Sequence, residues 1–487
     1  MRKNSKRIAR PLSLPPASGR KPRHRLTARD VIASAEEFTA FTQHFVEVFD
    51  RREQQHWSVF YLCGQLANLA RKTIEPMVLE LYGPDAKAVR ALQHFIGQSV
   101  WLAEAMIVRG QQLVAAWLSE ADGVVIADGS GFPKQGSDSV GVARQYCGHL
   151  GKVANCQEGV FLVYAGRGGY TFLDERLYVH QTWFGDEYRE RWQRCGIPDE
   201  VVFRTEPELA LEMMGGLVRR AVVPFRWVTA DERFGQNPAF LQGIAELGKW
   251  YLAEVPADTR VWKRTPPIEP PGRGPLGRPR LHPRVAKSAR PSERVDTLAK
   301  HLPRSMWKRY RIKEGSKGAV VADFAFLRVT AVRHGLPGPR QWLVFRRSVT
   351  EPVETKSYLS NAPAQCAPGE LVRVTGLRWP IETTLKEGKG EVGMDHYETR
   401  TWLGWHHHMA QTFMAHLFLA RLQLVFKKKS GVDDRSGASV DCPSDSRRRR
   451  SHRHRRADRL SPVAQSRRLS LSSQTRSFPP SSAAISA

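Results

Sequence analysis

The stretch that decides the fold is Val124-Val125-Ile126-Ala127-Asp128-Gly129-Ser130-Gly131. A short apolar run closed by Gly-Ser-Gly predicts a buried strand that ends at Asp128 in a turn. A similar run, Phe225-Arg226-Trp227-Val228-Thr229-Ala230-Asp231, precedes Asn237-Pro238, which are typical of a helix cap and a first helical position. Because a further strand is indicated at 250–255, this region predicts a β-α-β unit.

The rest of the chain extends this pattern in both directions. Apolar spacing between residues 35 and 118 is helical, and it returns from Pro380 and near 405–426. Segments rich in β-forming residues lie at 139–146, 158–165, 170–179, 318–331 and 341–349. Residues 256–315 are rich in Pro, Gly and Arg without periodicity, which indicates an inserted loop. We infer an α/β fold, a mixed sheet flanked by helices and preceded by an N-terminal helical domain.

The positive charge of the chain is concentrated in three segments. The net charge is +27 and the pI is near 10.2. Residues 1–30 hold ten basic residues against one acid, residues 260–315 sixteen against four, and residues 427–487 fifteen against five, so the remainder is nearly neutral. Such a distribution favours a polyanionic partner, and nucleic acid fits better than an anionic membrane surface.

Several other protein classes are disfavoured. The sequence has no unbroken apolar run of about 18 residues and no secretory signal, so we expect no membrane association and a cytoplasmic location. Six cysteines without a C-x-x-C pair predict neither a disulfide framework nor a zinc site. The consecutive His406, His407 and His408 would diverge by about 100° each on a helix. We therefore expect them on a polar helix surface.

Three acidic residues could form a metal site, although each has a simpler interpretation. An Asp at the end of a strand, such as Asp128 or Asp231, usually caps a turn by bonding local backbone. Glu382 stands in the first turn of a helix predicted to begin at Pro380, and it shares a face with Lys386 and Lys389, as in an ordinary surface pair. Two Asp and one Glu are also the oxygen ligands that phosphodiester transfer by two metal ions requires.

Motifs in a fixed order favour the second interpretation. They are Ile126-Ala127-Asp128-Gly129-Ser130-Gly131-Phe132-Pro133-Lys134-Gln135-Gly136, Ser139-Val140-Gly141-Val142-Ala143-Arg144-Gln145-Tyr146, Lys152-Val153-Ala154-Asn155-Cys156-Gln157, Pro207-Glu208-Leu209-Ala210, Val228-Thr229-Ala230-Asp231, Arg378-Trp379-Pro380-Ile381-Glu382 and Gly393-Met394-Asp395-His396-Tyr397. Over residues 36–425 the chain resembles the DDE transposases of bacterial insertion sequences, in the branch named after insertion sequence four and its group named after insertion sequence seven-hundred-one.

The resemblance implies an RNase H-like mixed-sheet catalytic core interrupted by a β-rich insertion. It assigns the metal-ligand and catalytic roles to Asp128, Asp231 and Glu382, with Mg²⁺ as the cofactor and Mn²⁺ as a substitute. The basic residues expected to contact DNA phosphates are Lys134, Arg144, Arg378, Lys386 and Lys389. Arg378, Glu382 and Lys389 fit the family's Tyr-Arg-Glu-Lys signature, whereas Thr375 stands at the Tyr position.

These inferences predict the organisation of the whole chain. The expected segments are a basic disordered arm (1–30), a helical, DNA-binding domain (31–120), the first part of the RNase H-like core (121–256), a basic loop with the β-rich insertion (257–350), the C-terminal helices of the core (351–426) and a basic Ser/Arg-rich disordered tail (427–487).

The leading functional hypothesis is an insertion-sequence transposase. It would cleave DNA at the terminal inverted repeats and join the freed 3′ hydroxyl to target DNA, as a homodimer in a synaptic complex associated with the bacterial nucleoid. One alternative is a catalytically decayed or co-opted transposase that only binds DNA, which Thr375 and the unusual tail favour. Another is a host nuclease that acts on RNA–DNA hybrids.

Overall fold

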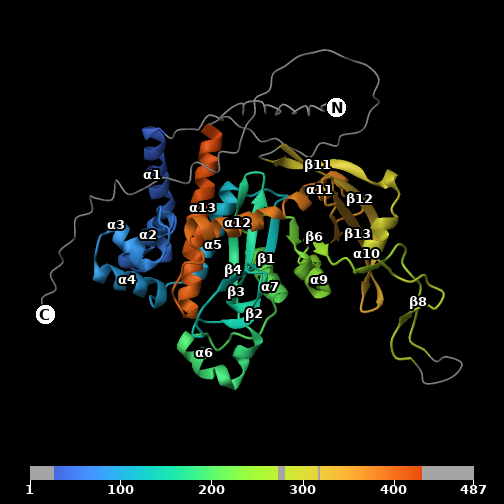
Figure 1. The fold of residues 1–487 in the computed structure, drawn as a ribbon, viewed down its shortest axis with the longest axis horizontal. Helices are drawn as coiled ribbons and strands as arrows, with labels where there is room; N and C mark the ends of the chain where they lie inside the picture. Colours follow the sequence, from blue (N-terminus) through green and yellow to red (C-terminus); the bar gives the residue numbers. More distant parts are fainter. Residues whose placement is uncertain (1–26, 273–279, 316–317, 430–487) are drawn as a thin grey trace, which may run out of the picture.

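The N-terminal part of the chain is helical, as predicted. The computed structural model describes residues 27–272, 280–315 and 318–429. The first helices, blue in Figure 1, are α1 (Ala28–Gln43), η1 (Val46–Val48), α2 (Arg52–Leu66), α3 (Ile74–Leu81), α4 (Ala86–Gly97) and α5 (Ala103–Trp117). Of the predicted arm and tail, residues 1–26 and 430–487 lie outside the described residues, and residues 427–429 continue the last helix.

One mixed sheet forms the centre of the molecule, which confirms the predicted fold class. Strands β4, β3, β1, β5 and β6 lie side by side in that order, antiparallel from β4 to β1 and parallel from β1 to β6. This is the strand order of an RNase H-like core. The bounds of the strands are β1 (Val124–Pro133), β2 (Ala143–Cys147), β3 (Lys152–Gly166), β4 (Gly169–Tyr178), β5 (Trp227–Ala230) and β6 (Trp250–Val255).

Strand β1 is longer than the sequence suggests. The prediction that it ends in a turn at Asp128 is wrong, because it continues to Pro133 and stays paired with β3 along its whole length. The glycines serve close packing instead. A Cβ at Gly129 would meet the Glu158 carboxylate at 2.8 Å, and one at Gly131 would meet it at 3.0 Å. Gly129 and Gly131 thus leave space for an acidic side chain from β3.

Short helices connect the core strands. They are η2 (Gln181–Phe184), η3 (Asp186–Tyr188), α6 (Arg189–Cys195), α7 (Glu206–Arg220), α8 (Glu232–Gly235) and α9 (Pro238–Glu246). Asn237 caps α9 by accepting hydrogen bonds from Ala239 N and Phe240 N at 3.0 and 3.1 Å, as its position before Pro238 predicts. This confirms the β-α-β unit formed by β5, α9 and β6.

The region between β6 and the C-terminal helices adds strands to the same sheet. The order continues from β6 through β14, β13, β12 and β7 to β10, and β11 pairs with β12. Residues 256–315, expected to be a loop, contain short strands and a helix, so that expectation is wrong. The elements are β7 (Arg260–Trp262), β8 (Ile268–Glu269), β9 (Arg284–Val285), β10 (Glu293–Arg294), α10 (Val295–His301), η4 (Arg304–Met306), β11 (Lys308–Gly315), β12 (Gly318–Arg333), β13 (Leu336–Ser348) and β14 (Thr355–Ser360).

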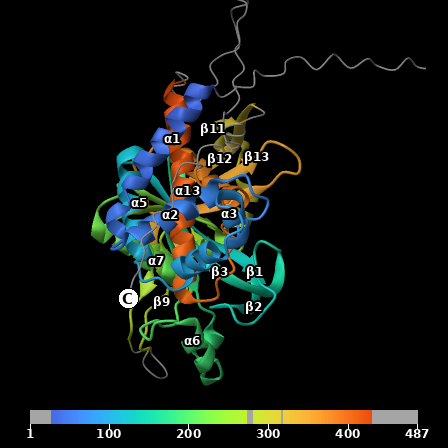
Figure 2. The ribbon, with the colours of Figure 1, turned by 90° about the vertical axis from the view of Figure 1, so that its left-hand side faces the viewer.

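The C-terminal helices return to the core. They are α11 (Pro368–Gly376), α12 (Trp379–Val392) and α13 (Trp402–Lys429). In Figures 1 and 2, α13 runs beside the N-terminal helices, and it contacts α2, α4, α5 and β4. Residues 402–426 are long and apolar enough to cross a membrane, yet 67% of their most apolar segment is buried inside the protein. We therefore interpret α13 as a core helix.

The three consecutive histidines are part of this packing, so the predicted polar helix surface is wrong. His407 and His408 are fully buried. The His407 ring stacks on Trp101 with centroids 3.7 Å apart, and its two nitrogens contact the carbonyl oxygens of Ile96 and Trp101. Hydrogen bonds that satisfy the buried ring explain how α13 accommodates polar residues at core positions.

Candidate functional site

Asp128 and Asp231 occupy matching positions on neighbouring parallel strands. Ala127 on β1 is in register with Ala230 on β5, and this is the last pair of their ladder. The next residue on each strand is the predicted acid. Because adjacent strands lie about 4.8 Å apart, the register brings the two carboxylates to the same edge of the sheet.

A third acid, which the sequence analysis missed, extends this row. Ala230 is also in register with Ala253 on β6, so Glu254 follows in the position that corresponds to Asp231. In each of these three strands the last residue of the shared ladder is an Ala followed directly by an acid, and this repeated dipeptide is a signal that the sequence offers for Glu254. Glu254 is buried, and its Oε1 accepts a hydrogen bond from Lys356 Nζ at 2.9 Å.

Asp128 lies in an electrostatic environment that disfavours its charge. Burial, and next the negative charge of Asp231, raise the pKa of Asp128 to about 7, while Arg378 opposes the shift and Glu382 adds a smaller increase. One carboxylate oxygen accepts a hydrogen bond from Gly129 N at 2.9 Å. The competition between like charges shows that Asp128, Asp231 and Glu382 act on one another through space.

Asp231 begins helix α8. Its Oδ1 accepts a hydrogen bond from Phe234 N at 3.2 Å, so the turn-capping interpretation applies to this residue as well. The helix packs tightly on β6, because a Cβ at Gly235 would collide with the carbonyl oxygen of Glu254. The absence of a side chain at Gly235 therefore allows α8 to hold Asp231 at the end of β5.

Helix α12 carries Glu382 and Arg378 to this edge. Pro380 lies in its first turn, and Glu382 Oε1 accepts a charged hydrogen bond from Arg378 Nη1 at 3.1 Å. Burial alone would lower the pKa of Arg378, but the surrounding carboxylates raise it, in the order Asp128, Glu254, Asp231 and Glu382. Arg378 is thus a cation among four acids. It balances charge at the position where they converge.

Two predicted phosphate-binding lysines lie on an aromatic pair formed by Phe132 and Tyr397. Lys389 Nζ donates a hydrogen bond to Gly131 O at 2.9 Å and lies 4.7 Å from the Phe132 ring centroid. Lys134 Nζ lies 3.6 Å from the Tyr397 ring centroid, and burial lowers its pKa to about 8. Since the Phe132 and Tyr397 rings are 5.9 Å apart, the fold brings these two lysines together.

The other predicted phosphate ligands, Arg144 on β2 and Lys386 on α12, are exposed. Lys313 is a further cation near Glu382 that was not predicted. Lys313 on β11 lies over the exposed ring of Trp379, 3.7 Å from its centroid, and the charge of Glu382 acts on it. Lys313 is distant in sequence from every motif described above, so no local pattern indicates it.

A second acidic pair lies on the opposite face of β1. The Glu158 and Glu206 carboxylates approach Gly129 from β3 and α7, and each has one buried oxygen without a hydrogen-bond partner. Burial and mutual repulsion raise the pKa of Glu158 to about 8, and burial raises that of Glu206 to about 7. Both glutamates pair with Arg233, two residues after Asp231.

The donor set suits a hard divalent cation in its chemistry. Carboxylate oxygens are the preferred ligands of Mg²⁺, and repulsion among the acids is what such an ion would relieve. Within residues 27–272, 280–315 and 318–429, no three His, Cys, Asp or Glu side chains lie close enough to hold an ion as they stand. For Glu382 to join Asp128 and Asp231, it has to exchange its Arg378 partner for the ion.

Thr375 lies in helix α11, directly before the helix that carries Glu382. Its side chain is buried, and its hydroxyl donates a hydrogen bond to Val372 O at 2.7 Å within α11. The hydroxyl is therefore satisfied by its own helix. The departure at this position leaves the arrangement of Asp128, Asp231, Glu382 and Arg378 intact.

Comparisons with known proteins identify a family and similar proteins. The family model described as DDE superfamily endonuclease matches residues 44–319, a range that includes Asp128 and Asp231 but not Glu382. A probable transposase for insertion sequence element IS701 of Microchaete diplosiphon is 25% identical over 336 residues, 68% of this chain and 73% of the relative. A solved structure, the piggyBac transposase synaptic complex with hairpin DNA, matches 84% of this chain and 77% of that chain, with a TM-score of 0.37 and 10% identity.

Proposed function

This chain belongs to the DDE superfamily of endonucleases and functions as a transposase, and we propose that Asp128, Asp231 and Glu382 are its catalytic acids. The observation that carries this proposal is the register of β1 and β5, which puts the first two acids side by side at one edge of the sheet. Helix α12 then presents Glu382 to the same edge.

The family depends on divalent metal ions, and Mg²⁺, with Mn²⁺ as a substitute, is the cofactor proposed here. Asp128, Asp231 and Glu382 would hold it. When bound, such ions supply an activated water and stabilise charge on the attacked phosphate. Asp128 has to lose its proton to act as a ligand, and Arg378, which opposes the increase in its pKa, assists that loss.

The cations around the acids are suited to hold the DNA backbone. Arg378 would be released from Glu382 when that carboxylate turns to the metal, so its planar guanidinium could bind a phosphate with two hydrogen bonds. Lys134 and Lys389 are fixed on their aromatic rings and act as point charges. Lys313 lies near Glu382, and the exposed Arg144 and Lys386 would contact further phosphates of the bound DNA.

The proposed partners are the terminal inverted repeats of the element and its target DNA. A homodimer would hold the two ends together, since strand transfer needs both in one complex. We propose a cytoplasmic protein associated with the nucleoid, in agreement with the excess of positive charge.

Cleavage of an end-labelled DNA fragment carrying the element terminus tests the proposal. Single changes Asp128→Asn, Asp231→Asn and Glu382→Gln should each abolish Mg²⁺- and Mn²⁺-dependent nicking and leave the gel shift of the same DNA unchanged. Glu391→Gln, on the same helix as Glu382, is the matched control and should retain activity. Nicking by Glu382→Gln at the wild-type rate would remove Glu382 from the site.

A protein that binds DNA without cutting it is the second candidate. It is favoured by the observation that the Thr375 hydroxyl is used within α11, where the family signature has a tyrosine. A wild-type protein that shifts the terminal DNA yet never nicks it with either metal ion would establish this alternative. The same assay on an RNA–DNA hybrid tests the nuclease hypothesis.

A further inference from the structure

The strands of the insertion extend beyond the catalytic edge of the sheet. Strand β6 ends at Val255, which is in register with Ser357 on β14. The neighbouring strands continue past this point. The first row beyond it contains Lys356, Arg346, Phe324 and Lys308, and the second contains Thr355, Arg347, Asp323 and Arg309. We call these two rows the overhang. They lie beyond the same strand ends at which Asp128, Asp231 and Glu254 are found.

The overhang is strongly basic on both faces. Successive residues of a strand point to opposite faces, so Arg346 and Lys308 face one side while Arg347 and Arg309 face the other. In these two rows, five of the eight residues are Lys or Arg and one is an acid. A concentration of positive charge at a sheet edge is a site for a polyanion.

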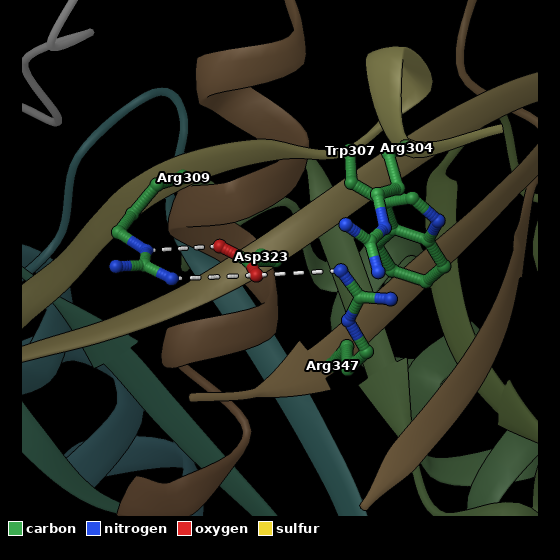
Figure 3. A pocket seen from close by; sticks show the side chains of 5 residues that line it. All are labelled: Arg304, Trp307, Arg309, Asp323 and Arg347. Carbon is green, nitrogen blue, oxygen red and sulfur yellow. Dashed lines mark hydrogen bonds and ion pairs between the residues drawn. The ribbon is translucent and has the colours of Figure 1, made fainter. Parts of the chain in front are cut away.

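On one face the overhang forms an open pocket of about 550 Å³ lined by Arg304, Trp307, Arg309, Asp323 and Arg347. Figure 3 shows Asp323 between the two arginines of its row. Arg309 Nε donates to Asp323 Oδ1 at 2.9 Å, and Arg347 Nη2 donates to Asp323 Oδ2 at 3.4 Å. Arg347 also lies over the Trp307 ring, 4.1 Å from its centroid. One carboxylate and one ring thus hold the guanidinium groups in place.

The pocket retains an excess of positive charge after its internal ion pairs are counted. Asp323 neutralises one of the two arginines it contacts, and Arg304 adds another cation at the rim. The Arg309 side chain is 62% exposed, so its remaining donors face outward. Exposed guanidinium groups held in fixed positions are suited to bind the oxygen atoms of a phosphate.

We propose that this pocket binds a backbone phosphate of duplex DNA that flanks the cleavage point. The inference rests on the proposed function, because it requires DNA at Asp128. The Arg347 row lies three residues beyond the Glu254 row, and β13 lies four strands from β1. These steps amount to roughly 20 Å, or about six base pairs of duplex. Because three is an odd number of residues, Arg347 and Asp323 point to the face of the sheet opposite to Asp128, Asp231 and Glu254. A duplex that passes over the ends of the strands, rather than along one face, therefore reaches both sites.

The experiment measures binding of a short fluorescent duplex DNA by the full chain in EDTA, so that cleavage plays no part. Arg309→Ala should lower the slope of log affinity against log salt by about 0.9 and weaken binding roughly five- to tenfold at 0.1 M salt. Arg340→Ala is the matched control, because Arg340 is an exposed arginine on β13 at the opposite end of that strand. It should leave the slope of the wild type unchanged.

Asp323→Asn should change the affinity for DNA in the opposite direction to Arg309→Ala. The amide keeps the size of the side chain and removes its negative charge, so DNA binding should become tighter, whereas a merely structural role for Asp323 would leave it equal or weaker. Equal salt slopes for wild type, Arg309→Ala and Arg340→Ala would overturn the inference, as would binding of a polyglutamate peptide at the pocket in preference to DNA. If wild type nicks terminal DNA while those slopes are equal, the pocket proposal fails and the catalytic proposal stands.

Discussion

Asp128 and Asp231 occupy equivalent positions on two adjacent parallel strands, one residue beyond the last pair of their ladder. Neither residue is brought to the other by a long side chain. The backbone register alone sets their proximity, and Glu254 continues the same row on the next strand. The backbone positions of these three acids are therefore set by strands at the centre of the sheet.

The raised pKa of Asp128 predicts how metal-free stability depends on pH. Burial and Asp231 raise its pKa to about 7 from an ordinary value of 3.8, so the folded protein binds a proton that the unfolded chain has released. This contribution to stability is present at low pH and is lost as pH rises towards 7. In EDTA, Tm should decrease between pH 5 and pH 8 more steeply for wild type than for Asp128→Asn. Glu158 and Glu206 shift in the same direction but are common to both proteins. If the Tm of wild type and that of Asp128→Asn changed equally with pH, the raised pKa of Asp128 would be contradicted.

The role of Glu254 can be separated from that of the proposed metal ligands. Glu254→Gln removes one of the carboxylates around Arg378 and the partner of Lys356, so single-turnover cleavage should slow roughly tenfold, less than for loss of a metal ligand. Lys356→Met breaks the same ion pair from the other side. If that variant slows cleavage equally, Glu254 acts through Lys356. A loss of activity as complete as in Asp128→Asn would instead make Glu254 a ligand.

Gly235 should be essential for the position of Asp231. A Cβ at this residue would collide with the carbonyl oxygen of Glu254, so Gly235→Ala should lower the free energy of unfolding by about 2–4 kcal/mol and reduce cleavage. Gly390→Ala, in helix α12 with open space around it, is the control and should stabilise the protein by about 0.5–1 kcal/mol. Urea unfolding measures both. Equal effects of the two changes would show that α8 can move away from β6.

The two lysines on α12 should respond differently to substitution. Lys389 bonds Gly131 O and packs on Phe132, so Lys389→Met should cost about 1 kcal/mol of stability as well as cleavage. Lys386 is exposed, and Lys386→Met should weaken DNA binding and lower the salt slope by about 0.9 without changing Tm. Unfolding and salt titration of each variant separate these effects. A Lys389→Met protein with the Tm of wild type would argue against its structural contact.

Much of the architecture could be predicted because it depends on local pattern. The apolar run before Asp231 and the Asn237-Pro238 cap predict β5 and α9 within a residue or two, since strand and cap preferences act over a few positions. The wrong prediction of a turn at Asp128 also came from local sequence pattern. Gly129 and Gly131 favour a turn locally, but their pairing with β3 makes them part of a longer strand, and their lack of side chains leaves space for Glu158.

The sequence by itself determined the fold class, the charge of the chain and the identity of Asp128, Asp231 and Glu382 as candidates, because hydrophobic period and ordered motifs are properties of neighbouring residues. Only the tertiary structure decided that Glu254 joins their row, that Lys313 lies beside Glu382, and that basic residues of β11, β13 and β14 extend beyond the catalytic edge. Each of these depends on which strand pairs with which and in what register, and such pairings join residues that no sequence spacing connects.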